Sequence, residues 1–393
     1  MSGILVNLEN IRPGCKAARD VVGPTGRTVL SEGTELTESE ISRLKQLGIV
    51  EVYINEEDFD AHASSEKKTQ SFDEPCVPVS RAGEPLSKER GERFEKAIDE
   101  SLHLLQSVSH SPEEILEQEQ HSLLAIPTQM LEMIVEDTDQ ILVTESKDNE
   151  IAKSIANNCT QLSILSMALA VELKLPKHEV DTIGMSGLLH DLGLFTMDPK
   201  LSDPRITLTE EETEIYEFHP FKSEQLLREL YGVPEDVFVL ILQVHERNDG
   251  RGFPRGLKEH HLHRLAPILQ LSNMYLTLTQ ARPGRPPIVP HDAIAFLLHQ
   301  CRKGLFEAEL LRAFLNLQSL YAIGAEVELD DGQQATVIRR DDARYDLPTV
   351  ETADSEVLRL AKSERRVRAP MMRQDQMRIS HEMLGDLDYF DLC

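Results

Sequence analysis

The sequence predicts a mainly α-helical protein, in which a helical bundle is preceded by a small α+β module and followed by a β-hairpin region. Residues 148–320 carry apolar side chains at helical spacings, with short loops between them, which is typical of a bundle. Residues 1–55 mix short strand-like runs with one capped helix. Residues 321–362 alternate apolar and polar side chains around Asp331 and Gly332, which strongly indicates a hairpin.

The N-terminal module is predicted from local signals. Strand-like runs occupy residues 4–6, 28–30 and 49–54. Thr37 and Glu40 have the spacing of a capping box, in which each side chain satisfies a backbone amide at the start of a helix. We find no group of residues in this module that is typical of a catalytic site, and the signal that it reads stays open.

The segments that flank the bundle have different compositions. Residues 56–87 are polar and charged and contain proline, which predicts a flexible linker. Residues 88–147 predict a helical spacer, interrupted near Pro112 and Pro127. A dimerisation element, and hence a homodimer, is the alternative for this spacer. Residues 363–393 predict a tail, in which a basic run is most simply solvated.

Charge and composition exclude several classes of protein. Acidic side chains number 68 against 41 basic ones, for a formal net charge of −27. A field of this sign repels nucleic acid polymers and anionic membranes, so we expect neither as a partner. The longest apolar run, residues 237–242, is too short for membrane insertion. Five cysteines without a CxxC pattern, and a start unlike a signal peptide, predict a cytoplasmic protein without disulfides.

The most informative segment is EVDTIGMSGLLHDLG, which predicts an apolar helix that ends in a histidine–aspartate pair. His190 and Asp191 stand at the end of this helix, and Gly184 and Gly187 allow another backbone to approach it closely. A lone histidine there is more often a hydrogen-bonded core residue. A buried carboxylate, however, needs a partner or a metal, so the pair indicates a functional site.

Other helices contribute polar groups to otherwise apolar faces. Asn158, His245 and Asn273 each lie on such a face, and His219 precedes a proline that suits a helix start. Polar groups that converge from several helices are typical of a metal site inside a bundle. The alternative is a set of buried side chains that only hydrogen-bond to one another.

A second informative segment, HERNDGRGFPRGL, follows the helix that carries His245. Its glycines and proline predict a tight loop of special shape, and the alternative is an ordinary turn. The loop residues that we single out are Asp249, Gly250, Gly252, Phe253 and Pro254.

The order of HDLG, FHP, HERNDGRGFP and ILQLSNMYLTLTQARPGR resembles the HD-GYP family across residues 148–320. This family is a branch of the HD-domain metal-dependent phosphohydrolases, and its characterised activity is hydrolysis of cyclic di-GMP. Residues 1–55 also resemble the small module that often precedes this domain. The resemblance implies that His190, Asp191 and two further histidines, His219 and His245, are metal ligands, with Asp191 as the catalytic residue.

The departures from the family pattern weaken the implied metal site. Asn158, Val244 and Asn273 stand where the family has histidine, histidine and aspartate, and Leu194 replaces a lysine that contacts phosphate. Neither asparagine nor valine supplies what a transition metal requires from imidazole or carboxylate. We therefore expect one divalent transition metal, iron or manganese, and no second.

The segment ARPGR contains two arginines with an implied role. By resemblance, Arg282 and Arg285 lie near the nucleotide phosphates, and an arginine fork suits phosphate oxygens. The alternative is a pair of solvated loop arginines.

Three hypotheses follow for the whole chain. We favour an HD-GYP-family protein of cyclic di-GMP signalling with a degenerate metal site, weak or inactive as a phosphodiesterase, that binds cyclic di-GMP or a protein signalling partner. The alternative is an active metal-dependent cyclic di-GMP phosphodiesterase. The third is a helical domain whose polar centre is purely structural. Metal content and turnover of cyclic di-GMP discriminate between them.

Overall fold

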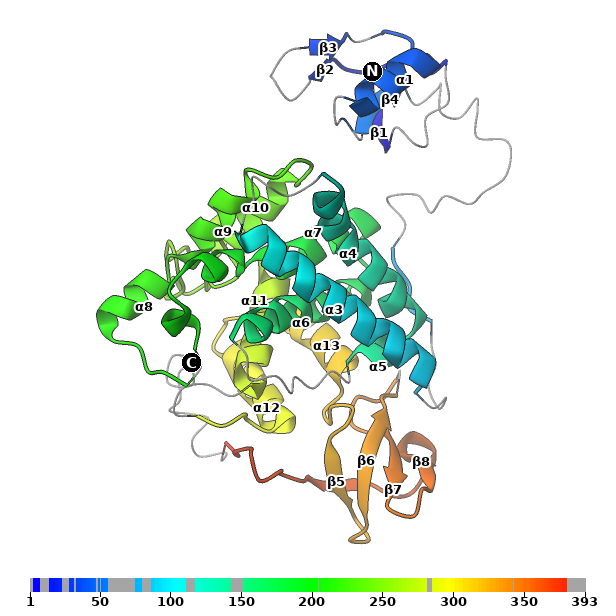
Figure 1. Cartoon of the computed structure of the whole chain (residues 1–393). Coiled ribbons are helices and arrows are strands. Elements are labelled where there is room, and N and C mark those ends of the chain that lie inside the picture. The colour runs from blue at the N-terminus through cyan, green and yellow to red at the C-terminus, as the bar shows by residue number, and fades with distance from the viewer. Residues whose placement is uncertain are drawn as a thin grey trace. The chain divides into compact units, whose positions relative to one another are not determined.

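The chain divides into two compact units, residues 1–71 and 72–393, in a computed structural model (Figure 1). The structure describes residues 3–7, 14–22, 28–31, 33–46, 49, 51–55, 75–79, 86–110, 117–142, 151–203, 205–280, 285–341 and 343–379. Among these residues, no helix is both long and apolar enough to cross a membrane.

The first unit is a small α+β module, as predicted. In its described part, two antiparallel strand pairs, β1 with β4 and β2 with β3, accompany helix α1. The Glu40 amide donates to the side-chain oxygen of Thr37 at 3.3 Å, so one half of the predicted capping interaction is present. The bounds of the elements are β1 Gly3–Asn7, β2 Val21–Val22, β3 Thr28–Leu30, α1 Glu38–Gln46 and β4 Glu51–Asn55.

The second unit is mainly helical, which confirms the predicted fold class. Its α-helices are α3 Lys88–His110, α4 Glu117–Glu136, α5 Thr138–Ile141, α6 Ile151–Glu172, α7 Lys177–Leu189, α8 Glu210–Tyr216, α9 His219–Leu227, α10 Glu235–Ile241, α11 Ala266–Thr279, α12 Pro290–Arg302 and α13 Ala308–Gln318. Among the described residues, short 3-10 helices η2 Leu192–Thr196, η3 Pro199–Ser202 and η4 Glu259–His261 lie between α-helices, and η5 Leu360–Lys362 lies between two strands of the C-terminal sheet.

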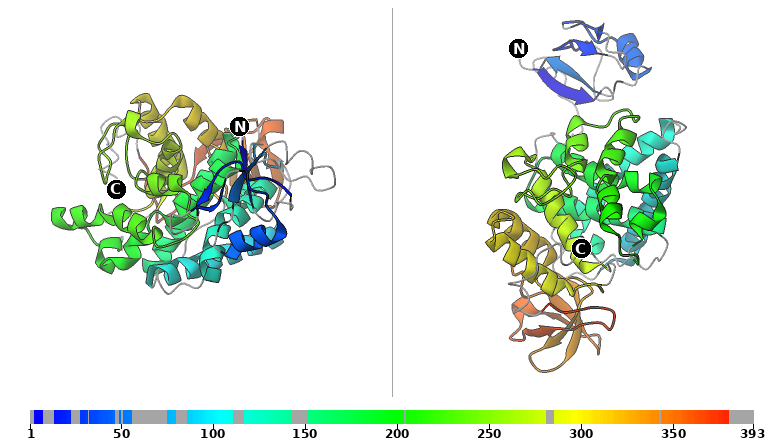
Figure 2. Two further views of the ribbon diagram at one scale, coloured as in Figure 1. Left: turned by 90° about the horizontal axis from the view of Figure 1, so that it is seen from above. Right: turned by 90° about the vertical axis from the view of Figure 1, so that its left-hand side faces the viewer.

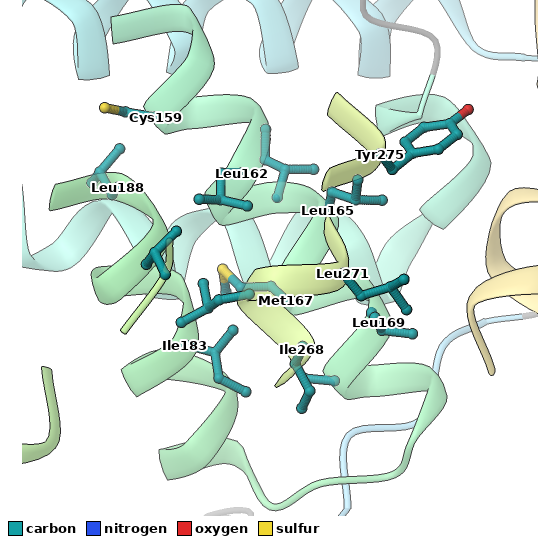
Figure 3. Close-up of a cluster of buried hydrophobic side chains, with 14 of the residues drawn as sticks. Cys159, Leu162, Leu165, Met167, Leu169, Ile183, Leu188, Ile268, Leu271 and Tyr275 are labelled. Atoms are coloured by element: carbon teal, nitrogen blue, oxygen red, sulfur yellow. The ribbon is translucent and has the colours of Figure 1, made fainter. Parts of the chain in front are cut away.

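Helix α6 forms the centre of the bundle. It contacts α3, α4, α7, α11 and α13, and most of its described side chains are buried. A helix that is apolar on all sides belongs in the interior of a larger structure. Figure 3 shows three leucines of this helix, Leu162, Leu165 and Leu169, beside Ile183 of α7 and Ile268 of α11.

The packing of α6 against α7 depends on Gly187. A methyl group at this position would lie 2.7 Å from the backbone nitrogen and Cα of Ser163 on α6. The hydroxyl of Ser163 in turn donates to the carbonyl of Gly184 at 2.8 Å. The two helices therefore touch backbone to backbone just before the histidine–aspartate pair, as the small residues predicted.

The prediction of an interruption at Pro127 was wrong, because α4 is continuous through this residue. Proline removes one backbone hydrogen bond, but Ile126 and Met130 on either side are buried in the core, and their packing offsets that loss. The other predicted interruption, near Pro112, lies outside the described residues.

The predicted hairpin is part of a five-stranded antiparallel sheet with strand order β8-β7-β6-β5-β9. Strands β5 and β6 form the hairpin, and Gly332 in its turn has a φ of 85°. The sheet lies at one end of the bundle, next to α12 and α13 (Figure 1 and Figure 2). The strand bounds are β5 Glu326–Leu329, β6 Gln334–Arg339, β7 Thr349–Thr352, β8 Val357–Arg359 and β9 Val367–Pro370.

Two predicted flanking segments are described only in part. Strand β9 lies within residues 363–393, which we predicted as a tail, so the sheet extends beyond the predicted boundary. Most of the predicted linker lies outside the described residues. Within it, Val79 donates its amide to the carbonyl of Val135 at 2.8 Å.

A buried ion pair joins the sheet to the bundle. Arg339 of β6 is fully buried, and its guanidinium contacts both carboxylate oxygens of Asp137, at 2.5 and 3.0 Å. Arg340 donates to Asp139 at 2.6 Å. A buried carboxylate requires such a partner, so the helical region and the sheet depend on each other.

Candidate metal centre

Four of the predicted ligands come together from three parts of the bundle. His190 and Asp191 follow α7 directly, His219 is the first residue of α9, and His245 lies in the turn after α10. His190 and His219 are 2% and 0% exposed, so their rings face the interior.

The ring nitrogens of the three histidines surround the carboxylate of Asp191. His190 Nε2 lies 3.1 Å from Asp191 Oδ2, and His219 Nε2 lies 2.9 Å from Asp191 Oδ1. His245 Nε2 lies 3.5 Å from the same Oδ1 and 3.1 Å from His219 Nε2. These residues therefore form one cluster with Asp191 at its centre.

Backbone carbonyls set the tautomers of two of these histidines. His190 Nδ1–H donates to the carbonyl of Gly187 at 2.9 Å, and His219 Nδ1–H donates to the carbonyl of Tyr216 at 2.8 Å. A carbonyl can only accept, so the proton of each neutral ring is on Nδ1. Each Nε2 then directs a lone pair at Asp191, which is the orientation that a metal ligand needs.

The carboxylate of Asp191 has an unsatisfied oxygen. Oδ1 is buried, and no described residue donates a hydrogen bond to it. A buried carboxylate oxygen without a hydrogen-bond donor is costly, and a bound cation would offset that cost. Imidazole nitrogens with a carboxylate are a donor set that divalent transition metals accept. The residues present therefore fit a divalent metal.

Charges and hydrogen bonds within the cluster shift the pKa values of its members. Burial opposes a charge on His190, but the adjacent Asp191 carboxylate outweighs it and holds the His190 pKa well above its usual range. Burial likewise opposes a charge on Asp191, yet His190 and His219 hold its pKa well below the usual range. Burial lowers the pKa of His245 to about 4, so this ring stays neutral.

Asn273 of α11 contacts His245. Its Nδ2 lies 3.3 Å from His245 Nδ1. In this orientation the amide donates, and His245 carries its proton on Nε2. A rotation of the amide by 180° presents Oδ1 as an acceptor and leaves the His245 Nε2 lone pair for a metal. Asn273 thus orients the ring in either state, although it lacks the charge of aspartate.

The structure adds a residue that the sequence analysis missed. The ligand atoms of Cys159, His190 and Asp191 all lie within 4.8 Å of one another. Cys159 is fully buried on α6, and burial raises the pKa of its thiol. Among the described residues, no hydrogen bond or ion pair joins Asn158, the predicted position, to this cluster, and Asn158 is half-buried.

The helical phase of α6 explains the difference. The sequence placed Asn158 on the stripe with Leu162 and Leu165. The face that meets α7 instead contains Ser163, which contacts Gly184, and Cys159 lies one turn before it on that face. A stripe of small residues at positions 159, 163 and 166 is the signal that could have identified it.

The predicted loop closes over His245. A side chain at Gly252 would lie 2.5 Å from the backbone nitrogen of Arg247, so only glycine fits there. The Glu246 carboxylate accepts the amides of Arg255 and Leu257, both at 2.7 Å. Phe253, beside Pro254, stacks on the His245 ring with centroids 4.7 Å apart and planes 10° apart.

The other two loop residues shape this turn. Gly250 has a φ of 76°, a region that glycine adopts without strain. Asp249 accepts a hydrogen bond from Arg247 at 2.7 Å and one from the Arg251 amide at 3.1 Å. Both interactions are local, and neither residue contacts the histidine cluster through them.

A pocket opens beside His245 and Asn273. Val244, at a position where the resemblance implies histidine, is 1% exposed and forms part of the pocket wall. The pocket is lined by Val244, His245, Glu246, Arg247, Phe253, Gln270, Asn273, Met274, Leu305 and Phe306.

Of the two arginines predicted to contact phosphate, the structure describes only Arg285. Arg282 lies outside the described residues. The Arg285 guanidinium donates to the carbonyls of Leu278 and Thr277, at 3.0 and 2.7 Å, where α11 ends. Leu194, at the lysine position of the family, is 5% exposed and belongs to the core.

Residues 129–310 match the family of HD domains. The chain is 32% identical over 177 residues to a cyclic di-GMP phosphodiesterase of Pseudomonas aeruginosa, a match that covers 45% of this chain and 42% of that protein. It is 31% identical to a cyclic di-GMP phosphodiesterase response regulator of Xanthomonas campestris pv. campestris, over 39% of this chain and 41% of that one.

Two further likenesses extend the comparison. A 3′3′-cGAMP-specific phosphodiesterase of Vibrio cholerae is 29% identical, over 40% of this chain and 37% of that protein. A solved HDG"Y"P protein from Bdellovibrio bacteriovorus aligns at a TM-score of 0.48 and 17% identity, covering 80% of this chain and 98% of that one. The chain spans less than half the length of each of these three curated relatives. Residues 129–310 therefore match the HD-domain family, and this part of the chain is similar in sequence to cyclic dinucleotide phosphodiesterases.

Proposed function

We propose that this HD domain is a metal-dependent phosphodiesterase that hydrolyses a cyclic dinucleotide, with cyclic di-GMP as the substrate to test. The main support for this proposal is the cluster in which three histidine nitrogens lie within 3.5 Å of the Asp191 carboxylate oxygens. The relatives named as cyclic di-GMP phosphodiesterases support this substrate class. They favour the enzyme, which the sequence analysis held as its alternative, over binding without turnover.

His190, Asp191, His219 and His245 would hold the metal. When bound, a divalent metal supplies positive charge that acidifies a water molecule and offsets the negative charge of the phosphoryl oxygens. Iron or manganese remains the predicted metal, and a single tightly held ion the predicted stoichiometry. Asp191 is the residue on which the cluster depends, because it is the one carboxylate among the four.

The surrounding residues prepare this chemistry. The carbonyls of Gly187 and Tyr216 fix two imidazole rings before a substrate arrives, so the rings need no reorganisation. Phe253 covers one face of His245 and excludes water from that side. The adjacent pocket combines apolar walls from Phe253 and Phe306 with nearby amide groups, a lining that suits a planar, polar-edged base.

Arg282 and Arg285 remain our proposal for the phosphate contacts. Arg285 would have to release the carbonyls at the end of α11 in order to reach a phosphate. A guanidinium forms two parallel hydrogen bonds to phosphate oxygens, which offset the loss of those contacts.

The test is hydrolysis of cyclic di-GMP by the full-length protein, stripped with a chelator and reloaded with manganese or iron(II). We expect turnover by the wild type, and a loss of about a hundredfold or more in Asp191→Asn. The matched control is His178→Ala, because His178 lies on α7 with its side chain 52% exposed. Metal-loaded wild-type protein without turnover, or an Asp191→Asn variant as fast as the wild type, would contradict the proposal.

A second candidate function is nucleotide or partner binding without turnover. The observation that favours it is the burial of Val244 and Leu194, apolar side chains at two positions where the resemblance implies histidine and lysine. Calorimetry with cyclic di-GMP separates the candidates, since this function requires binding by the metal-loaded protein with no product formed.

A further inference from the structure

We propose that the thiolate of Cys159 is a ligand of this metal centre, which makes it a mixed sulfur, nitrogen and oxygen site. The inference rests on the proposed metal site and adds a ligand that the resemblance to HD-GYP proteins does not supply. It also names the class of metal that the site prefers: zinc(II), iron(II) or cobalt(II), which accept thiolate, over manganese(II).

The position of the sulfur carries the first part of the argument. The ligand atoms of Cys159, His190 and Asp191 lie within 4.8 Å of one another. Metal–ligand distances of about 2.0–2.3 Å place two ligands of one ion at most about 4.6 Å apart. Only a small side-chain rotation is therefore needed for the three atoms to share an ion. In Figure 3 the sulfur of Cys159 points away from Leu162 and Leu165 of its own helix.

Backbone packing holds the sulfur at this place. Ser163, one turn after Cys159, touches Gly187 of α7 so closely that no side chain fits between them. Gly187 also binds the His190 ring through its carbonyl. The same contact between α6 and α7 thus positions both the thiol and the imidazole.

A second, independent observation favours a cation beside the Asp191 carboxylate. Asp191 is 7% exposed, and its Oδ1 has no hydrogen-bond donor among the described residues. Asp191 also belongs to both groups of converging ligand atoms, one with Cys159 and His190 and the other with His219 and His245. A buried cysteine alone is usually a small apolar core residue. Here the cysteine lies beside the buried Asp191 carboxylate, one oxygen of which has no hydrogen-bond partner among the described residues, and this favours a role as a metal ligand.

The consequence is a change in metal preference. Thiolate is a soft ligand, which strengthens binding of zinc, iron(II) and cobalt(II) much more than binding of manganese(II). It also adds a negative charge that Asn158 and Asn273 do not supply. Cys159 thereby replaces part of the donor capacity that the departures at these two positions remove.

The experiment uses full-length protein loaded with cobalt(II), because a cobalt–thiolate bond gives a charge-transfer band in the near-ultraviolet spectrum. We expect the band in the wild type and in Cys301→Ser, the matched control on α12, and its loss in Cys159→Ser. Competition should show that Cys159→Ser loses at least tenfold more affinity for zinc than for manganese. A band that survives in Cys159→Ser would overturn the proposal.

X-ray absorption of the zinc-loaded wild type keeps the test independent of whether a variant folds. Zinc–sulfur scattering near 2.3 Å supports the inference, whereas a shell of only nitrogen and oxygen at about 2.0–2.2 Å overturns it and leaves the histidine–aspartate metal site intact. Protein that binds no divalent metal at all would overturn both this inference and the proposed function.

Discussion

Gly187→Ala tests whether the contact between α6 and α7 sets the geometry of the centre. The added methyl would lie 2.7 Å from two backbone atoms of Ser163. Comfortable carbon contacts need about 3.5 Å, so the helices must separate by about 0.8 Å. Both partners are backbone, and no side chain can rotate away to relieve the overlap.

Two effects oppose each other in this variant. Overpacking a close contact costs about 1–3 kcal/mol, whereas alanine is favoured over glycine inside a helix by about 1 kcal/mol. We therefore expect a net loss of up to about 2 kcal/mol in the free energy of unfolding. In a domain of this size each 1 kcal/mol lowers Tm by about 2–4 °C.

The matched control is Gly91→Ala on α3. A methyl there would meet the flexible end of the Gln140 side chain at 3.1 Å, which can move away. We expect this variant to be neutral or more stable by up to about 1 kcal/mol. The assays are thermal unfolding and zinc affinity of both variants. Equal stabilities, or unchanged zinc affinity in a destabilised Gly187→Ala, would refute the reasoning.

Three further predictions concern the metal and the stability of the chain. Asp191→Asn should abolish tight metal binding in an elemental assay; two ions per chain that survive the change would contradict the predicted single ion. Arg339→Met should lower the free energy of unfolding by about 1–3 kcal/mol, because the buried Asp137 carboxylate loses its closest arginine and keeps only Arg90, at 3.1 Å. Arg368→Met, which removes an exposed pair, should cost at most about 1 kcal/mol in the same denaturation assay. Asp292 has a lowered pKa, because Arg378 and His291 outweigh its burial; its contribution is present above about pH 4 and is lost as the pH falls through the folded pKa. The difference in free energy of unfolding between wild type and Asp292→Asn should shrink in acid. A difference that stays constant with pH would show that the Asp292–Arg378 ion pair is not its cause.

Much of the fold could be predicted because its signals are local. Helical spacing, the capping pair at Thr37 and Glu40, and the Asp331–Gly332 turn each depend on a few adjacent residues, and the observed elements agree with them. The interruption at Pro127 was predicted from an equally local rule, and tertiary packing overrode it. Strand β9 was missed because its partner, β5, lies about 40 residues earlier and no nearby turn signals the pairing.

The candidate site was harder to predict, because a site depends on which face of each helix points inward. The adjacent pair His190–Asp191 needed no such choice. On α6, one residue of helical phase separates Asn158 from Cys159, and the sequence pattern did not point to Cys159, whose sulfur lies near His190 and Asp191. The helix-end contacts of Arg285 depend on a loop conformation that residue spacing does not encode.

The buried ion pair between Arg339 and Asp137 makes the stability of the helical bundle depend on the C-terminal sheet. The matched HD segment ends at residue 310, before the first strand of the sheet. A gene fragment cut at that boundary would lack Arg339 and Arg340, so the buried Asp139 would lose both of its arginine partners and Asp137 would keep only Arg90. Transfer of the helices to another protein would thus cost stability unless the strands that carry these arginines were transferred with them. A fragment designed for transfer into another protein should therefore end after β9, not after α13.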